Sequence, residues 1–196
     1  MVKPMAVAGA MVCWGVLFVG CAPAVEPTPS PEPSPVPTFQ CTPEAGGEAY
    51  ACDQAEYEAM VVRDEQYAEA ERVYRRAMEI VNALTNSKQP INSELIAITT
   101  GSAQADFEKA LLDISQDGAE YSGTPEIEWI RRAPDAVDQG SVVALEVCTS
   151  PGDQVVVVDG VPIPSSTAFE RVFFRLEDGQ MKMASGQAGE VASCWQ

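Results

Sequence analysis

Histidine is absent from the 196-residue chain, and its absence excludes several kinds of chemistry. Without histidine there is no Ser-His-Asp or Cys-His catalytic centre, and no zinc or haem site with a histidine ligand. The sequence also lacks a Cys-x-x-Cys pair, a glycine-rich phosphate loop, and the Ser-x-x-Lys and Gly-x-Ser-x-Gly nucleophile motifs. We therefore expect no catalytic residue of these classes, no metal and no cofactor.

Basic residues are scarce: 12 Lys and Arg stand against 29 Asp and Glu, a net charge of -17. A nucleic-acid-binding surface needs clustered cations, so we expect no nucleic-acid partner. The acidic cluster between Asp53 and Glu71 lacks the Asp-x-Asp-x-Asp-Gly spacing of a calcium loop, and we interpret it as a solvated helix face. Arg75-Arg76 and Arg131-Arg132 could each bind an acidic ligand or simply balance local charge.

Residues 1–20 have the features of an export signal. Lys3 is followed by an uncharged, largely apolar run from Met5 to Gly20. The run is short for a membrane-spanning helix, which needs roughly 20 apolar residues, but it suits a secretory signal. It ends in Leu17-Phe18-Val19-Gly20-Cys21, which resembles the lipobox of bacterial lipoproteins. This resemblance implies that Cys21 is lipidated with palmitate-type acyl chains and becomes the mature N-terminus; a plain signal peptide or an uncleaved anchor helix are the alternatives.

Proline occupies nearly every second position from Ala22 to Pro37. Because proline fixes φ and lacks a backbone donor, residues 21–40 are predicted to form an extended stalk behind the lipidated Cys21. At ~3.1 Å per residue, such a stalk reaches up to about 60 Å. We therefore expect a protein attached through Cys21 to the outer face of the bacterial cytoplasmic membrane, with residues 41–196 as its globular domain.

Four cysteines remain in this globular domain: Cys41, Cys52, Cys148 and Cys194. An even number of cysteines in an exported domain indicates two disulfides, and four cysteines allow three connectivities. We expect Cys41–Cys52, which closes a short loop, and Cys148–Cys194, which fastens the last strand to a central one.

The first half of the domain has helical periodicity. Asp53 and Glu56 form a capping-box pattern, and apolar residues then recur at three- and four-residue steps as far as Leu84. This pattern predicts one long helix. A short helix is expected near residues 94–99, and a third helix is expected from a cap at Ser102 to about Asp117.

The second half has alternating periodicity, and Asp178-Gly179 is a strong hairpin signal. Strands are predicted near residues 119–122, 126–133, 141–149, 154–158, 168–177, 180–185 and 190–194. The expected fold class is α+β: a long N-terminal helix and two shorter helices packed on a curved antiparallel sheet.

This order resembles the nuclear transport factor 2-like superfamily, and more narrowly the small lipoproteins of high-GC Gram-positive bacteria that carry such a domain. The resemblance rests on residues 67–75 of the long helix, on Thr99-Thr100-Gly101, and on Val147-Cys148 with a second cysteine near the C-terminus. It implies a cone-shaped domain from about Cys52 to Cys194. In the enzymes of the superfamily, the cone holds a pocket with a His or Asp as acid or base.

Possible residues of such a pocket are Tyr67, Tyr74 and Trp129, although aromatic residues at helical spacing are more often core. Asp106 and Asp113 fit solvated helix faces better than a catalytic role. We therefore expect a non-catalytic binding or accessory module whose protein or small-molecule partner is unknown. One alternative is an isomerase- or dehydratase-type enzyme with an Asp base in the cone, which a buried carboxylate with raised pKa would favour. Another is a prophage-type surface lipoprotein that blocks superinfection.

Overall fold

The computed structural model describes residues 38–195. The predictions for the signal segment, for the lipidation of Cys21 and for most of the stalk therefore concern residues outside the described part of the chain. Within residues 38–195, no helix is both long and apolar enough to cross a membrane.

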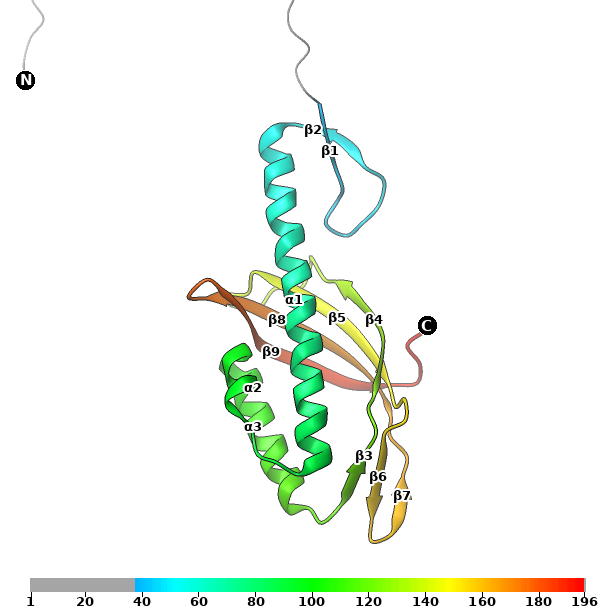
Figure 1. Ribbon diagram of the computed structural model, residues 1–196. Helices are drawn as coiled ribbons and strands as arrows, with labels where there is room; N and C mark the ends of the chain where they lie inside the picture. Colours follow the sequence, from blue (N-terminus) through cyan, green and yellow to red (C-terminus); the bar gives the residue numbers. More distant parts are fainter. Residues whose placement is uncertain (1–37, 196) are drawn as a thin grey trace, which may run out of the picture. The chain divides into compact units, whose positions relative to one another are not determined.

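Three helices form the first layer of the domain (Figure 1). Helix α1, Gln54–Ser87, begins with the predicted capping box: the Glu56 N–H donates to Asp53 Oδ1 at 2.9 Å, and the Asp53 N–H donates to Glu56 Oε2 at 3.2 Å. Helix α2, Ser93–Ile98, is followed by α3, Gly101–Gln116.

The start of α3 corrects one prediction, because its N-cap is Thr100 and Ser102 lies inside the helix. Gly101 has φ +58°, and a Cβ at this position would lie 2.8 Å from the Ala184 carbonyl oxygen. A residue with a side chain would be strained at this φ and would clash with the sheet. The close approach of α3 to the sheet therefore explains why the first residue of the helix is glycine.

The strands form three antiparallel sheets in place of the single sheet that was expected. The main sheet has the order β4-β5-β8-β9, the second β3-β6-β7, and β1 pairs with β2. The bounds are β1 Phe39–Cys41, β2 Tyr50–Cys52, β3 Glu120–Ser122, β4 Glu126–Arg132, β5 Val143–Ser150, β6 Val155–Val158, β7 Val161–Ile163, β8 Thr167–Glu177 and β9 Gln180–Val191.

The predicted break between strands 180–185 and 190–194 is wrong, because β9 runs unbroken from Gln180 to Val191. It pairs with β8 from Thr167 to Glu177, with one register shift between Phe173 and Phe174. Neither the short hairpin β1–β2 nor the strand β7 was predicted from the sequence.

The core lies between the main sheet and the helices, which confirms the α+β class. We call the sheet face that carries Val143, Leu145 and Val147 the inner face; these side chains pack with Tyr74 and Ala77 of α1. The opposite, outer face carries the alternate residues of each strand.

Two disulfides have the pairing expected from the sequence. Cys41–Cys52, with Cα atoms 5.9 Å apart, joins β1 to β2, and Cys148–Cys194, at 5.7 Å, holds the C-terminal tail against β5. Structural disulfides are typical of an oxidising, extracytoplasmic environment.

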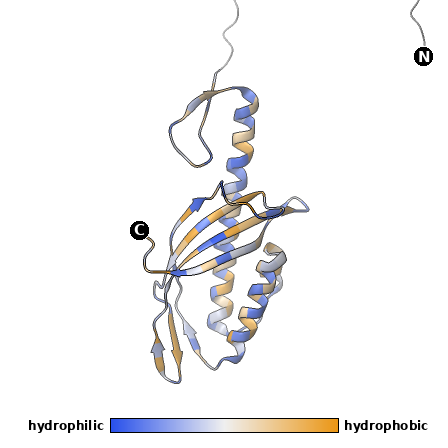
Figure 2. Ribbon diagram, turned by 180° about the vertical axis from the view of Figure 1, so that it is seen from behind, coloured by the Kyte–Doolittle hydropathy of each residue, from blue (hydrophilic) through white to orange (hydrophobic). Residues whose placement is uncertain are grey.

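The three-stranded sheet is unusually apolar on its surface. Figure 2 shows the β6–β7 hairpin in the colour of hydrophobic residues, and the exposed side chains there are Val155, Val158, Val161 and Ile163.

Candidate functional site

A cavity of about 320 Å³ lies on the inner face, between α1, α3 and the strands β8 and β9. Most of its lining is apolar: Met78 and Val81 from α1, Phe107 from α3, and Val172 and Met183 from the sheet. Two residues bring carboxyl groups to this lining: Glu170 of β8, which is partly buried, and Asp106 of α3, which is exposed.

The cavity begins where the inward side chains of β9 become small. Met183 pairs with Phe174, and both are buried. At the next inward positions of the register, Gly186 stands opposite Val172 and Ala188 opposite Glu170. After Met183, the inward positions of β9 therefore carry only a hydrogen atom at Gly186 and a methyl group at Ala188. The space between this part of the sheet and α3 stays unfilled.

A second cavity, of about 460 Å³, lies between α1 and the strands β4, β5 and β8. Its lining is more polar and includes Arg75, Asn82 and Thr149. Met78 and Glu170 line both cavities. We call the two cavities together the Glu170 cleft.

Glu170 is partly buried, and its Oε2 accepts a hydrogen bond from the Tyr74 hydroxyl at 3.2 Å. Within residues 38–195, no Lys or Arg forms an ion pair with it. Arg75 lines the second cavity, but its guanidinium donates to Glu71 at 2.7 and 2.9 Å.

Burial raises the pKa of Glu170, and the hydrogen bond from Tyr74 opposes this rise only in part. Burial and the neighbouring Glu170 charge also raise the pKa of Tyr74, so its hydroxyl stays protonated and donates. The pair thus combines a carboxyl group that can exchange a proton with a neutral hydrogen-bond donor.

Of the three aromatic residues proposed for a pocket, only Tyr74 is linked to the Glu170 cleft, through its hydrogen bond to Glu170. Tyr67 is buried in the core, and its hydroxyl donates to Glu44 in the β1–β2 connection at 2.7 Å. The prediction for Trp129 is wrong, because this residue pairs with Cys148 on the outer face. A register shift between Ile127 and Trp129 leaves Ile127 and Ile130 packed against the core.

On the outer face, the Trp129 indole donates to the Cys194 carbonyl oxygen at 3.0 Å and packs against Phe169. Trp129 therefore helps to hold the C-terminal tail, and Arg131 lies over its ring at 4.1 Å.

The two aspartates of α3 are exposed, as expected. Asp113 pairs with Lys109 at 2.5 Å, whereas Asp106 lies at the mouth of the cleft. Glu170 was not predicted from the sequence as a site residue. Its signal was the alternation itself, because Glu170 continues the inward series of Val172 and Phe174 and places a charge on an apolar face.

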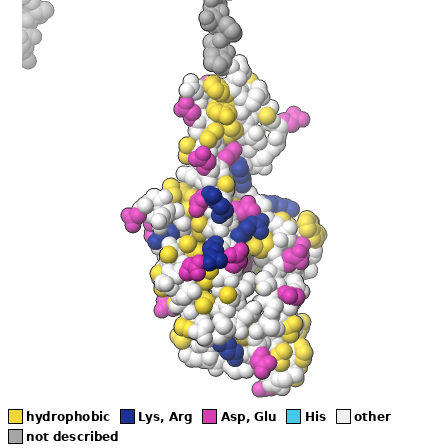
Figure 3. Space-filling model, viewed as in Figure 1, with side chains coloured by type: hydrophobic (Ala, Val, Ile, Leu, Met, Phe, Trp, Pro, Cys, Tyr) yellow, Lys and Arg dark blue, Asp and Glu magenta, His cyan; other side chains and the backbone are white. Residues whose placement is uncertain are grey.

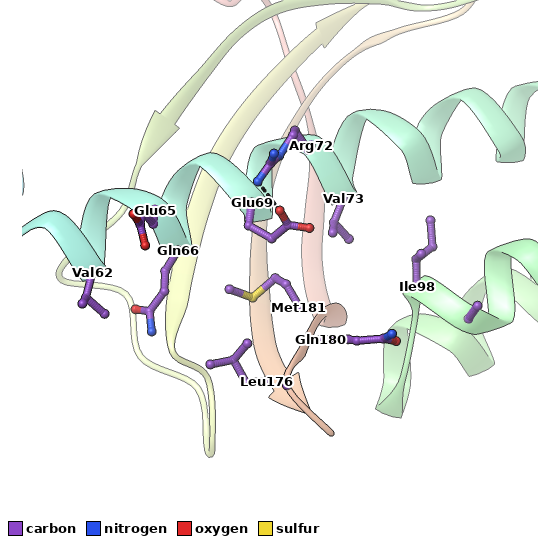
Figure 4. Close-up of a pocket in the computed structure, with 12 residues that line it drawn as sticks. Val62, Glu65, Gln66, Glu69, Arg72, Val73, Ile98, Leu176, Gln180 and Met181 are labelled. Carbon is purple, nitrogen blue, oxygen red and sulfur yellow. Dashed lines mark hydrogen bonds and ion pairs between the residues drawn. The ribbon is translucent and has the colours of Figure 1, made fainter.

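A wider groove, of about 920 Å³, runs between α1, α2 and the β8–β9 hairpin. Figure 4 shows Val62, Gln66 and Val73 pointing from α1 toward this hairpin, where Leu176 and Met181 lie. Its charged residues are at the rim, and Arg72 pairs with Glu69. Of the two carboxyl groups among the described residues that line it, Glu65 is exposed and the partly buried Glu69 is paired with Arg72, so the groove has no partly buried carboxyl group without a cationic partner.

The exposed arginines of α1 already have acidic partners. Figure 3 shows basic and acidic side chains gathered on the middle of the domain. On α1, Arg75 pairs with Glu71, and Arg76 pairs with Glu79 and with Glu94 of α2. Charge balance therefore accounts for the Arg75-Arg76 pair. In residues 38–195, no group of His, Cys, Asp and Glu is arranged to hold a metal ion.

Comparison with known proteins gives only distant similarity. No family model matches the sequence, and no curated protein matches it. The intermembrane space region of the chloroplast protein ARC6 is 14% identical, with a TM-score of 0.46, over 62% of this chain and 95% of that one. Aln2 from a Streptomyces species is 15% identical, with a TM-score of 0.42, over 64% of this chain and 90% of that one.

Proposed function

We propose that this protein is a lipid-anchored, extracytoplasmic lipoprotein whose domain is a non-catalytic binding module for a small molecule. The observation that carries the binding function is the Glu170 carboxyl, which lines two adjoining cavities and has no cationic partner in residues 38–195. A partly buried carboxylate without a cationic partner is costly, and ligand sites commonly place a few polar groups in a mostly apolar cavity.

The proposed address rests on the sequence before the domain and on the disulfides within it. Cys21 follows an apolar signal-like run, and a proline-rich stalk separates it from the domain. Most of the acidic residues behind the chain's net charge of -17 lie in the domain and would repel it from anionic headgroups, so the stalk serves as a spacer.

Fractionation of cells tests the anchor. The wild-type protein should stay in washed membranes, and its detergent-extracted mass should correspond to a chain that starts at Cys21 with acyl chains attached. Cys21→Ala should move to the soluble fraction, because stable attachment needs two or more acyl chains. Cys13→Ala is the matched control and should stay with the membranes. Retention of Cys21→Ala would show that lipid on this residue is not the anchor.

Native mass spectrometry tests the binding module. We expect extra mass on the native protein that is lost on denaturation. In Ala188→Leu, whose new side chain enters the cleft, this mass should disappear. Gly189→Leu is the matched control, because Gly189 faces outward on the same strand and a Cβ there meets nothing within 4 Å. Equal ligand mass in both variants would place the ligand elsewhere.

The second candidate function is acid–base catalysis of the isomerase or dehydratase type, with Glu170 in place of the expected Asp. The specific observation in its favour is a carboxyl with raised pKa beside the neutral donor Tyr74. Such a base would exchange protons next to the carbonyl group of a bound ketone. We would follow deuterium uptake by 4-phenyl-2-butanone in D₂O by NMR. Exchange that is faster than in buffer and is lost in Glu170→Gln supports catalysis, and exchange at the buffer rate rejects it for this ketone class.

A further inference from the structure

The charges around the Glu170 cleft have predominantly one sign. The more apolar cavity has two carboxyl groups in its lining, Glu170 and Asp106, and no Lys or Arg among the described residues. The second cavity adds Glu79 and Arg75. Because Arg75 is held by Glu71, and Glu79 by Arg76, these groups leave Glu170 without a counterion.

The hydrogen bonds of Glu170 are also incomplete. Tyr74 donates to Oε2, and no residue between 38 and 195 donates to Oε1. A carboxylate accepts several hydrogen bonds, and a partly buried one is stabilised most by a charged donor. A ligand that complements this carboxyl group therefore supplies a hydrogen-bond donor, preferably one with a positive charge.

The remaining walls define the rest of the ligand. Met78, Phe107, Val172 and Met183 surround the space next to Glu170, and Gly186 and Ala188 keep it open. Such walls favour an apolar body over a second polar group. Thioether and aromatic side chains also pack well against flat rings and adapt to different shapes.

We propose that the Glu170 cleft binds an organic amine: an ammonium group that pairs with the Glu170 carboxylate, joined to an apolar body that occupies the cavity between Met78, Phe107 and Met183. This inference rests on the proposed binding function and gives the chemical class of its ligand. An anionic ligand is disfavoured by Glu170 and Asp106, and a neutral one forms a weaker hydrogen bond with Glu170.

Three probes that share a phenylethyl group test the class: 2-phenylethylamine, 2-phenylethanol and 3-phenylpropanoate. The full chain, labelled with ¹³C at its methionine methyl groups, is placed in lipid nanodiscs, and empty nanodiscs correct for partition of the probes into lipid. Met78 and Met183 line the cleft and report binding there. Met60 and Met181 lie outside it and are internal controls.

We expect 2-phenylethylamine to shift the Met78 and Met183 methyl signals, with at least tenfold higher affinity than 2-phenylethanol, and 3-phenylpropanoate to cause no shift. In Glu170→Gln, which keeps the acceptor for Tyr74 but loses the charge, the amine should bind no more tightly than the alcohol. Glu120→Gln is the matched control, since Glu120 is exposed on β3 and has no ion pair. If Glu170→Gln does not fold, Ala188→Leu should block the amine by filling the cavity.

The contrary outcomes separate the two proposals. If the alcohol or the carboxylate binds as tightly as the amine, or if Glu170→Gln keeps the preference for the amine, the cleft binds small molecules but the amine class is wrong. If no probe shifts Met78 or Met183, the cleft takes none of these ligands, and the proposed binding function fails together with the ligand class.

Discussion

The inner face of the main sheet has two halves that differ in packing. At one end, Phe174 and Met183 pair across β8 and β9, and both side chains are buried. At the other end, Glu170 pairs with Ala188, and the space between the sheet and α3 is open. The same two strands thus supply the core of the domain and its candidate site.

The difference shows how a small change in side-chain size converts a core into a site. Interiors are close-packed, and a cavity in one costs stability in proportion to its volume. The two strands stay paired across both halves, with one register shift between Phe173 and Phe174, and the cavity lies beside the short side chains Gly186 and Ala188 of β9. A domain that keeps such a cavity and places a carboxyl in it is suited to receive a ligand.

The largest effect is expected from opening the filled half. Phe174 is fully buried, so Phe174→Ala should lower the free energy of unfolding by about 3–5 kcal/mol. Leu176→Ala is the matched control on the same strand and face, and because Leu176 is 46% exposed its loss should be about 1 kcal/mol or less. Urea denaturation measures both. Similar losses for the two variants would contradict the assignment of Phe174 to a filled core.

Enlarging side chains on β9 should have opposite consequences in the two halves. Ala184, the unpaired residue at the register shift next to the filled half, is 1% exposed, and Ala184→Leu should lower the free energy of unfolding by about 1–3 kcal/mol through overpacking. Ala188→Leu enters an open cavity and should leave stability unchanged or raise it. Urea denaturation of the two variants under the same conditions compares them directly, and equal destabilisation would mean that the cavity is not free space.

Removal of one hydroxyl tests the polar pair in the open half. Tyr74→Phe should lower the free energy of unfolding by about 1 kcal/mol, the usual net contribution of a hydrogen bond. It should also raise the pKa of Glu170, because the Tyr74 hydrogen bond stabilises the carboxylate. Tyr67→Phe, which loses its bond to Glu44 instead, should leave the pKa of Glu170 unchanged. NMR titration of the side-chain carboxyl distinguishes the two variants.

The smallest effect is a difference in pH dependence between two carboxyl groups. Burial raises the pKa of Glu170 in the folded protein. The contribution of Glu170 to the stability of the folded state is therefore fully present below the unfolded pKa of about 4.3 and is lost as pH rises through the folded pKa. Glu170→Gln should therefore gain stability relative to wild type between acid and neutral pH.

Asp64 should behave in the opposite way. Its burial is outweighed by hydrogen bonds from Arg132 and Arg63, so its pKa is lowered. The contribution of Asp64 to the stability of the folded state is present above its unfolded pKa and is lost as pH falls through the folded pKa. Asp64→Asn should thus lose stability at neutral pH and approach wild type in acid. Denaturation curves from acid to neutral pH that show the same trend for both variants would contradict these assignments.

The sequence predicted those parts of the fold that depend on local patterns. The Asp53–Glu56 capping box and the alternation of Val143, Leu145 and Val147 depend on neighbours in the chain, and both appear as expected. Trp129 was misplaced because a register shift in β4 changes which residues face inward, and a shift of this kind leaves no mark on the alternation.

The candidate site was harder to predict, because it depends on which residues of β8 and β9 stand opposite each other. Glu170 interrupts an apolar face, which is a visible signal, but a charge at such a position can equally lie at an exposed strand end. The small residues Gly186 and Ala188 indicate a cavity only once they are known to pair with Val172 and Glu170. This pairing register is a property of the folded sheet.

The pKa of Glu170 in the full-length protein is the most direct test of this account. A ¹³C-detected NMR titration of the Glu170 carboxyl, with and without 2-phenylethylamine, measures both the environment of the group and its response to a cation. We expect a pKa above the ordinary glutamate value of about 4.3, and we expect it to fall when the amine is added. A pKa at or below the ordinary value that does not respond to the amine would show a solvated surface carboxyl and no binding cleft.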